Sequence, residues 1–203
     1  MAQIPIVAEH AKHAKLVLNV ESVDITTEQF FRLCRDNPDF RLELTAQKEI
    51  VIMAPTGYKT GIRNAKIVRQ LVDWAERDGT GVTAGTDAGS TLPNGAIRGP
   101  DASWMSREKW DALTPEQQER FVPTCPDFVL ELRSPGDLLS ELKTKLTEYM
   151  ENGAQLGLLI DPFDRKVYVY RPDAAPECIE EPASVRCDPP LHGFNLNLTE
   201  IWA

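Results

Sequence analysis

The sequence has few of the residues that build disulfide scaffolds, zinc sites or histidine-based centres. Its four cysteines lie far apart and form no CxxC pair, which argues against both a disulfide framework and a zinc site. The histidines, His10, His13 and His192, sit near the two ends of the chain. We therefore expect reduced, unpaired thiols and no histidine-based metal or acid–base centre.

Sequence signatures of several common enzyme classes are also missing. There is no GxGxxG dinucleotide signature and no GxxxxGK phosphate loop, and Ser134 does not lie in a GxSxG elbow. Dehydrogenase, P-loop and serine-hydrolase functions therefore lose their usual support. No apolar run approaches the length that spans a bilayer, and the N-terminal segment MAQIPIVAEHAKHAK lacks the apolar core of a signal peptide. These absences predict a cytoplasmic protein without a membrane partner.

Basic residues are fewer than acidic ones, and the net charge is −9. Such a charge argues against avid, non-specific DNA binding, because Lys and Arg contacts with phosphates supply most of that affinity. A local basic patch is still compatible with the total. The 203 residues suffice for one well-cored domain. We predict an N-terminal arm over residues 1–24 and a single domain over residues 25–203.

The order of helix and strand signals predicts an α/β (α+β) fold. A capping box at Thr26 starts a first helix, and the segments FRLELT and EIVIMAP follow it as a hairpin of two strands. In the first of these strands, Glu43 points away from the face that carries Phe40. Two roles stay open for this carboxylate: it is solvated, or it is an outer ligand of a site.

A helix from about Lys59 to Arg77 separates apolar from basic residues. The apolar positions recur with a period of 3.6 and are Ala65, Val68, Leu71, Val72 and Ala75. The basic residues of the opposite side are Lys59, Arg63, Lys66 and Arg77. This basic side is either an ordinary solvated face or a stripe that contacts nucleic-acid phosphates.

The strand predicted for Asp127–Arg133 contains the least ordinary residue of the chain. Phe128, Leu130 and Leu132 share one face, and Glu131 lies in mid-strand on the other face beside Val129. A carboxylate among apolar neighbours costs several kcal/mol unless it is paired or bound to a metal ion. Glu131 is therefore either the ion-pair partner of Arg133 or a metal ligand.

A Ser-Pro-Gly turn and an amphipathic helix follow this strand. Asp137 is placed to cap the helix, which runs to Asn152-Gly153. Its buried side consists of Leu138, Leu142, Leu146 and Tyr149. Lys143 and Lys145 lie at the two margins of that side, and each either extends to solvent or turns inward. The apolar segment LGLLID then completes a βαβ unit with parallel strands, and VYVYR adds an antiparallel partner.

A second candidate acid, Asp101, follows Pro100 at the start of another predicted strand. This dipeptide is either an ordinary turn or the first acid of a PD…(D/E)xK constellation. In that constellation two acidic groups from adjacent strands hold a hard divalent cation, and a lysine orients or activates water. Asp127 is a rival because it shares a strand face with Glu131, but the strand rise separates these two by about 13 Å.

Four segments carry a resemblance to a known family. They are LPNGAIRGPDASW, PDFVLELRSPGD, KTKLTEYMENGAQLGLLIDP and VYVYRP. Taken in this order, they closely resemble the Uma family of restriction endonuclease-like proteins, which is abundant in bacteria. The resemblance covers roughly residues 25 to 202, and the motifs are specific in combination.

The resemblance implies a restriction-endonuclease-like core, a mixed central sheet flanked by helices, Mg²⁺ or Mn²⁺ as cofactor, DNA as substrate and a homodimer. It places the metal ligands at Asp101 and Glu131 and the catalytic lysine at Lys145. It also implies a supporting role for Glu43. Arg133 stands where the strand lysine of ExK usually stands, and it can stabilise developing phosphate charge although it cannot act as a base.

Two functions of different classes remain open. The first is a divalent-metal-dependent endonuclease that uses Asp101, Glu131 and Lys145. The second is a catalytically silent nucleic-acid-binding or regulatory module with the same fold, which the acidic net charge and Arg133 favour. A metal site that serves a substrate other than DNA is a third interpretation.

Overall fold

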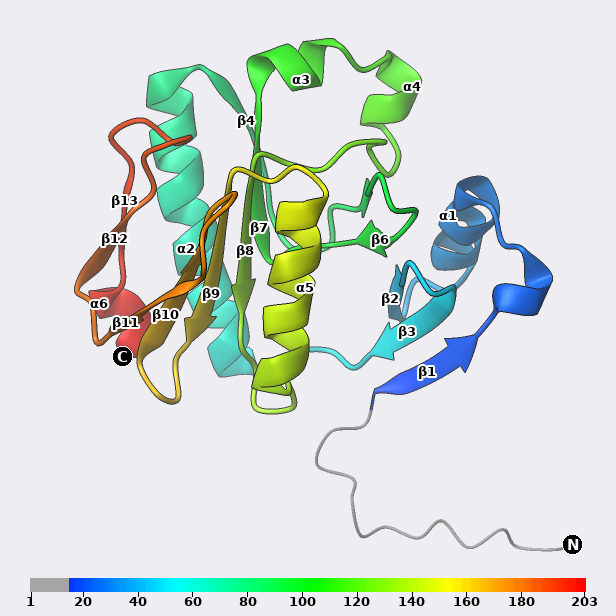
Figure 1. Ribbon diagram of the computed structural model, residues 1–203, viewed down its shortest axis with the longest axis horizontal. Coiled ribbons are helices and arrows are strands. Elements are labelled where there is room, and N and C mark those ends of the chain that lie inside the picture. Colours follow the sequence, from blue (N-terminus) through cyan, green and yellow to red (C-terminus); the bar gives the residue numbers. More distant parts are fainter. Residues whose placement is uncertain (1–14) are drawn as a thin grey trace, which may run out of the picture.

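The computed structural model describes residues 15–203 and is built on two main β-sheets with helices packed against them (Figure 1). The larger sheet has six strands, and only β8 and β9 pair in parallel. Its strands are, in spatial order, β11 (Glu177–Glu180), β10 (Lys166–Tyr170), β9 (Leu156–Asp161), β8 (Phe128–Leu132), β7 (Ala102–Ser106) and β4 (Gly81–Ala84). This mixed sheet with its flanking helices confirms the predicted fold class.

The smaller sheet has five antiparallel strands. In spatial order they are β1 (Leu16–Asn19), β3 (Glu49–Met53), β2 (Arg41–Leu44), β6 (Ile97–Arg98) and β5 (Ser90–Thr91). A hairpin of β12 (Ser184–Arg186) and β13 (Asn195–Asn197) lies near the C-terminus. The helices are η1 (Glu21–Val23), α1 (Thr27–Asp36), α2 (Tyr58–Asp78), α3 (Arg107–Asp111), α4 (Pro115–Gln118), α5 (Leu139–Glu151) and α6 (Thr199–Trp202). Among the described residues, no helix is long and apolar enough to cross a membrane.

The predicted βαβ unit is confirmed by β8, α5 and β9, and both of its strands are buried along their whole length. Helices α5 and α2 cover opposite faces of the larger sheet (Figure 1). On β8, Leu130 packs in the core that includes α2, whereas Val129 packs in the core that includes α5. Because side chains alternate along a strand, Glu131 shares the face of Val129 and points toward α5.

The small sheet and α1 also follow the sequence pattern. Thr26 caps α1 through the predicted capping box with Gln29, and Phe30 of this helix packs on the core of the small sheet. The predicted N-terminal arm falls only partly within the structure, because residues 1–14 lie outside the described residues. Leu16–Asn19 of that arm pair with β3 as an edge strand of the small sheet.

Helix α2 spans the predicted range, but its buried side is rotated from the predicted one. Ile67, Leu71 and Trp74 are buried, whereas Ala65 is exposed. Arg63, predicted on the solvent side, is also buried: its Nε donates to the Ile201 carbonyl at 2.8 Å. The Nζ of Lys66 donates to the Glu200 carbonyl at 2.9 Å. The structure thus uses Arg63 and Lys66 of this basic side to hold α6, whereas Lys59 and Arg77 are exposed.

The start of α5 differs from the predicted cap. The helix begins after Leu138, which makes no side-chain cap and is 41% exposed rather than buried. Asp137 instead accepts a hydrogen bond from the Ser134 amide at 2.8 Å, so its carboxylate closes the Ser-Pro-Gly turn. Leu142, Leu146 and Tyr149 are buried as predicted.

Substitution of Arg63 by Ala should destabilise the protein by about 1–3 kcal/mol, because it leaves the backbone carbonyl of Ile201 in α6 without its buried donor. Chemical denaturation of the wild type and the variant measures the difference. Lys59→Ala is the matched control, since this exposed lysine of the same helix should change stability by less than about 0.5 kcal/mol. Equal stabilities of the two variants would show that the hydrogen bond from Arg63 to α6 contributes nothing to stability.

Candidate active site

The candidate site lies where the chain passes from the small sheet to the large one. Strand β6 of the small sheet ends at Arg98, and Gly99-Pro100-Asp101 lead directly into β7 of the large sheet. In the antiparallel pair of β7 and β8, Ala102 is opposite Leu130. Continuing this register by one residue sets Asp101 opposite Glu131. The two predicted metal ligands therefore meet because they are neighbours on adjacent strands.

Asp101 and Glu131 are both buried, with exposed fractions of 6% and 3%. The backbone amide of Leu132 donates to Asp101 Oδ2 at 2.8 Å, which fixes this carboxylate against β8. The hydroxyl of Tyr149 donates to Glu131 Oε1 at 3.3 Å. Both acids are thus held in place by groups of the large sheet and α5.

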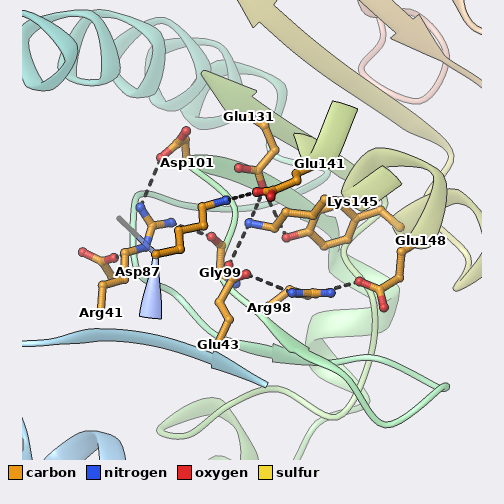
Figure 2. Close-up of polar contacts among 12 residues, drawn as sticks. Arg41, Glu43, Asp87, Arg98, Gly99, Asp101, Glu131, Glu141, Lys145 and Glu148 are labelled. Carbon is orange, nitrogen blue, oxygen red and sulfur yellow. Dashed lines mark hydrogen bonds and ion pairs between the residues drawn. The ribbon is translucent and has the colours of Figure 1, made fainter. Parts of the chain in front are cut away.

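Lys145 reaches this pair from α5 (Figure 2). Its Nζ lies 2.8 Å from Glu131 Oε1 and 2.7 Å from Glu43 Oε1. The side chain is 12% exposed, so it turns inward instead of extending to solvent. Lys143, on the other margin of the helix, places its Nζ 4.0 Å from the ring centroid of Tyr168 and stays outside the cluster. Of the two candidate lysines, only Lys145 joins the acids.

Glu43 is 4% exposed, and the alternative that it is solvated is wrong. The pairing of Leu44 with Ile97 continues by one residue to set Glu43 opposite Arg98. Arg98 Nη1 lies 3.2 Å from Glu43 Oε2, and the Gly99 amide donates to Glu43 Oε1 at 3.1 Å. Glu43 therefore connects the small sheet with Lys145.

Two arginines that the sequence reasoning missed complete the cluster (Figure 2). Arg98 Nε is 2.6 Å from Glu148 Oε2. Arg41 lies 3.5 Å from Asp101 and 2.9 Å from Asp87, and it donates to the Gly99 carbonyl at 2.6 Å. The alternation of β2 puts Arg41 on the same face as Glu43, so that pattern could have identified it.

Burial sets the protonation of the two candidate ligands. It raises the pKa of Glu131 to about 7: Lys145 opposes this rise, and the negative charges of Asp101 and Glu43 add to it. Burial also raises the pKa of Asp101, against the opposing charge of Arg41. Both carboxyls therefore hold their negative charge less readily than in water, and a bound cation would stabilise that charge.

For Lys145 and Glu43, in contrast, the surroundings favour the charged form. Burial disfavours the charged form of Lys145, but Glu131 and Glu43 outweigh burial and raise the pKa of the ammonium. Burial likewise disfavours the charge of Glu43, yet Lys145 and Arg98 outweigh it and lower the pKa of this carboxyl to about 2. Lys145 thus remains an ammonium group, which donates hydrogen bonds and does not act as a base.

The donor set fits a hard divalent cation that keeps part of its water shell. The carboxylates of the cluster outnumber its cationic groups: Glu43, Asp87, Asp101, Glu131 and Glu148 face Arg41, Arg98 and Lys145. The contacts of Glu131 with Lys145 and Tyr149 all use Oε1. Within residues 15–203, no three His, Cys, Asp or Glu side chains converge into a complete cage. Mg²⁺ does not need one, because it is commonly held by one or two carboxylates plus waters.

Asn64 of α2 supplies a second observation in favour of a ligand here. It is 7% exposed, and its Nδ2 lies 3.4 Å from Asp101 Oδ1. Its Oδ1 is buried and has no hydrogen-bond partner in the structure. Such an unpaired buried oxygen costs about 1–3 kcal/mol, which a water molecule or a cation beside Asp101 would recover.

Two other acidic or basic candidates lie outside the cluster. Arg133 pairs with Asp161 at 2.7 Å, so the predicted alternative of a Glu131–Arg133 ion pair is wrong. The reason is register: Leu132 pairs with Ile160 in parallel, and the next residues are Arg133 and Asp161. Asp127, the rival acid, pairs with Lys109 at 2.6 Å and accepts from the Ser106 amide at 2.8 Å.

Glu43→Gln should lower stability by about 3–5 kcal/mol near neutral pH, because it removes one partner of buried charge pairs. The folded-state pKa of Glu43 is below its ordinary value of 4.5, so its contribution is full above about pH 4.5 and is lost as the pH falls toward about 2. Denaturation at pH 6 and pH 3 should therefore show a larger gap between wild type and variant at pH 6. Glu49→Gln, on the neighbouring strand, is the control. A difference in unfolding free energy between wild type and Glu43→Gln that is the same at pH 6 and pH 3 would contradict the lowered pKa of Glu43.

Comparison with known proteins identifies the fold and the family. The crystal structure of a DUF820 protein from Anabaena variabilis, described as a "putative nuclease", superposes with a TM-score of 0.71 at 21% sequence identity. The match covers 88% of this chain and 97% of that one, so the two share a fold. No protein of curated function matches the sequence. Residues 27–199 match the Uma2 family, described as "Putative restriction endonuclease". Because this match spans most of the chain, the protein belongs to the Uma2 family of restriction endonuclease-like proteins.

Proposed function

We propose that this protein is a divalent-metal-dependent endonuclease that hydrolyses phosphodiester bonds of DNA. The observation that carries the proposal is the convergence of Asp101, Glu131 and Lys145 from three elements into one buried cluster. Family membership and the fold shared with the Anabaena protein support nuclease chemistry in general. DNA as substrate, the cation and the homodimer are proposals drawn from the resemblance.

Asp101 and Glu131 would hold Mg²⁺ or Mn²⁺, with Asn64 beside Asp101 as an additional oxygen donor directly or through water. When bound, such a cation supplies Lewis-acid polarisation of the phosphate and lowers the pKa of a coordinated water. The protein contributes fixed positions: the Leu132 amide holds Asp101, and Tyr149 holds Glu131. A site whose groups are already oriented needs little reorganisation during the reaction.

Lys145 would position the attacking water and stabilise charge that develops on the phosphate. Its ammonium lies against both Glu131 and Glu43, and its raised pKa keeps it charged at neutral pH. Glu43 orients this lysine, because its own charge is fixed by Arg98 and the Gly99 amide. Asp101, Glu131, Lys145 and Glu43 would therefore act as a unit, in which Glu43 positions Lys145 and does not contact the reacting phosphate.

Lys145→Met should lower the rate of DNA nicking in Mg²⁺ or Mn²⁺ by about 100- to 1,000-fold, as expected for removal of one preorganised charge donor. Lys143→Met is the matched control, because Lys143 lies on the same helix, contacts Tyr168 and stays outside the cluster. Conversion of supercoiled plasmid to the nicked form measures the rate, and circular dichroism verifies the fold.

Glu131→Gln should abolish nicking in the same assay, because it removes the charge of a proposed metal ligand. Activity that persists in this variant would sink the proposal.

Titration with Mn²⁺ separates the nuclease from a catalytically silent binding or regulatory module of the same fold. Calorimetry or electron paramagnetic resonance should detect binding by the wild type and a loss of at least about tenfold in affinity in Asp101→Asn. Asn64→Leu should also weaken binding, whereas Asp127→Asn should not, because Asp127 is engaged with Lys109. If the wild type shows no affinity at millimolar Mn²⁺, the silent module is the better description.

A further inference from the structure

A cavity of about 510 Å³ lies beside the candidate site, and nothing in the proposed chemistry uses it. We propose that it receives an unpaired DNA base next to the cleaved phosphodiester, so that the enzyme prefers single-stranded or frayed DNA over intact duplex. This inference rests on the proposed nuclease function and names its substrate class. It is carried by the position, the walls and the charge of the cavity.

The cavity shares side chains with the cluster. Arg41, Glu43 and Arg98 line it and also make the ion pairs that surround Asp101 and Lys145. Further walls come from the segment between α1 and β2, the segment between β3 and α2, the loop between β4 and β5, and the segment between α4 and β8. A group bound there would therefore lie next to a phosphate held at the cluster.

Aromatic side chains form part of the walls. Phe40 lines the cavity and is 55% exposed, so one of its sides is free to take a stacking partner. Phe121, also in the lining, is fixed by an edge-on contact with Phe31 at 5.1 Å between ring centroids. It packs so closely on Gly89 that a Cβ there would lie 2.1 Å from the ring. One wall is thus rigid, and the exposed Phe40 ring can stack on a flat ligand.

The charges of the cavity indicate which part of a nucleotide enters it. Its charged lining consists of Asp39, Arg41, Glu43, Asp87 and Arg98. Both arginines are already paired with carboxylates, Arg41 with Asp87 at 2.9 Å and Arg98 with Glu43 at 3.2 Å. The lining therefore has no surplus positive charge to attract a phosphate. A neutral base with a polar edge fits these walls better than the negatively charged sugar-phosphate backbone of DNA does.

Strand pairing decides which DNA can supply such a base. In a duplex the base is stacked and paired, and removing it from the stack costs a few kcal/mol. In a single strand or a frayed end the base is already available. The cavity therefore favours unpaired DNA, and its contribution comes mainly from stacking.

The test uses fluorescence anisotropy with the full-length protein and one labelled oligonucleotide in EDTA, where cleavage does not interfere. The intact single strand should bind at least about tenfold more tightly than its duplex, and an abasic substitution at one position should remove most of that difference. Phe40→Ala should weaken single-strand binding by about 5- to 100-fold, whereas Phe40→Trp should retain it. Phe163→Ala, an equally exposed phenylalanine outside the cavity, should bind like the wild type.

Equal binding of duplex and single strand, or wild-type affinity in Phe40→Ala, would overturn the base cavity while leaving nuclease activity open. Cleavage assays of the same oligonucleotides in Mg²⁺ keep the two proposals separate. If the oligonucleotides bind as expected but are not cleaved, the result supports base binding in the cavity and contradicts the proposed nuclease activity. Free deoxynucleoside monophosphates, titrated alone, should bind weakly and lose that binding in Phe40→Ala.

Discussion

The ammonium group of Lys145 is the interaction on which the site depends. It lies 2.7 Å from Glu43 on the small sheet and 2.8 Å from Glu131 on the large one, while its backbone belongs to α5. One buried charge therefore ties together three elements that are distant in sequence. In a medium of low dielectric constant such pairs are strong, and removing one partner is costly. The relative position of the two sheets at the site thus depends on this lysine.

The same burial explains why an acidic protein can carry a site for phosphodiester chemistry. The net charge of −9 is a property of the whole chain, whereas the reaction depends on the local balance around Asp101 and Glu131. Burial and mutual repulsion raise the pKa of Glu131, even with Lys145 in contact. In the proposed nuclease, the excess of carboxylates over cationic groups would favour a divalent cation, which Asp101 and Glu131 would hold. A basic surface is not required for the chemical step.

Much of the fold could be predicted from periodicity and capping. Alternation along Asp127–Arg133 places Glu131 inside the protein, and the capping box at Thr26 marks the start of α1. What periodicity cannot supply is the register between strands. Strand alternation leaves Arg133 open as a partner of Glu131 because the two share a face, but the parallel register with β9 pairs it with Asp161. Alternation likewise cannot decide between a solvated Glu43 and an outer ligand, because its partners Arg98 and Lys145 come from β6 and α5.

The site residues fall into two groups: those marked by a local sequence signal and those recruited by contacts between elements. The Pro-Asp start of β7 and the mid-strand glutamate are local signals, and they identified Asp101 and Glu131. Arg98 and Asn64 have no such signal, because each is recruited by a contact between elements that are separated by dozens of residues. Alternation along β2 marks the face of Arg41, but only the packing of the two sheets shows that this face meets a site.

The position of the lysine on a helix has a physical consequence for the whole active site. Arg133, two positions beyond Glu131, lies past the end of β8 and pairs with Asp161 of the large sheet. A lysine that approaches from α5 can touch Glu131 and Glu43 at the same time. Lys145 therefore fixes the position of the cavity wall formed by Glu43 and Arg41 relative to Glu131 and its neighbour Asp101. In the proposed mechanism, a substrate that binds in the cavity would be positioned against Asp101 and Glu131 by Lys145, the residue that would also orient the water.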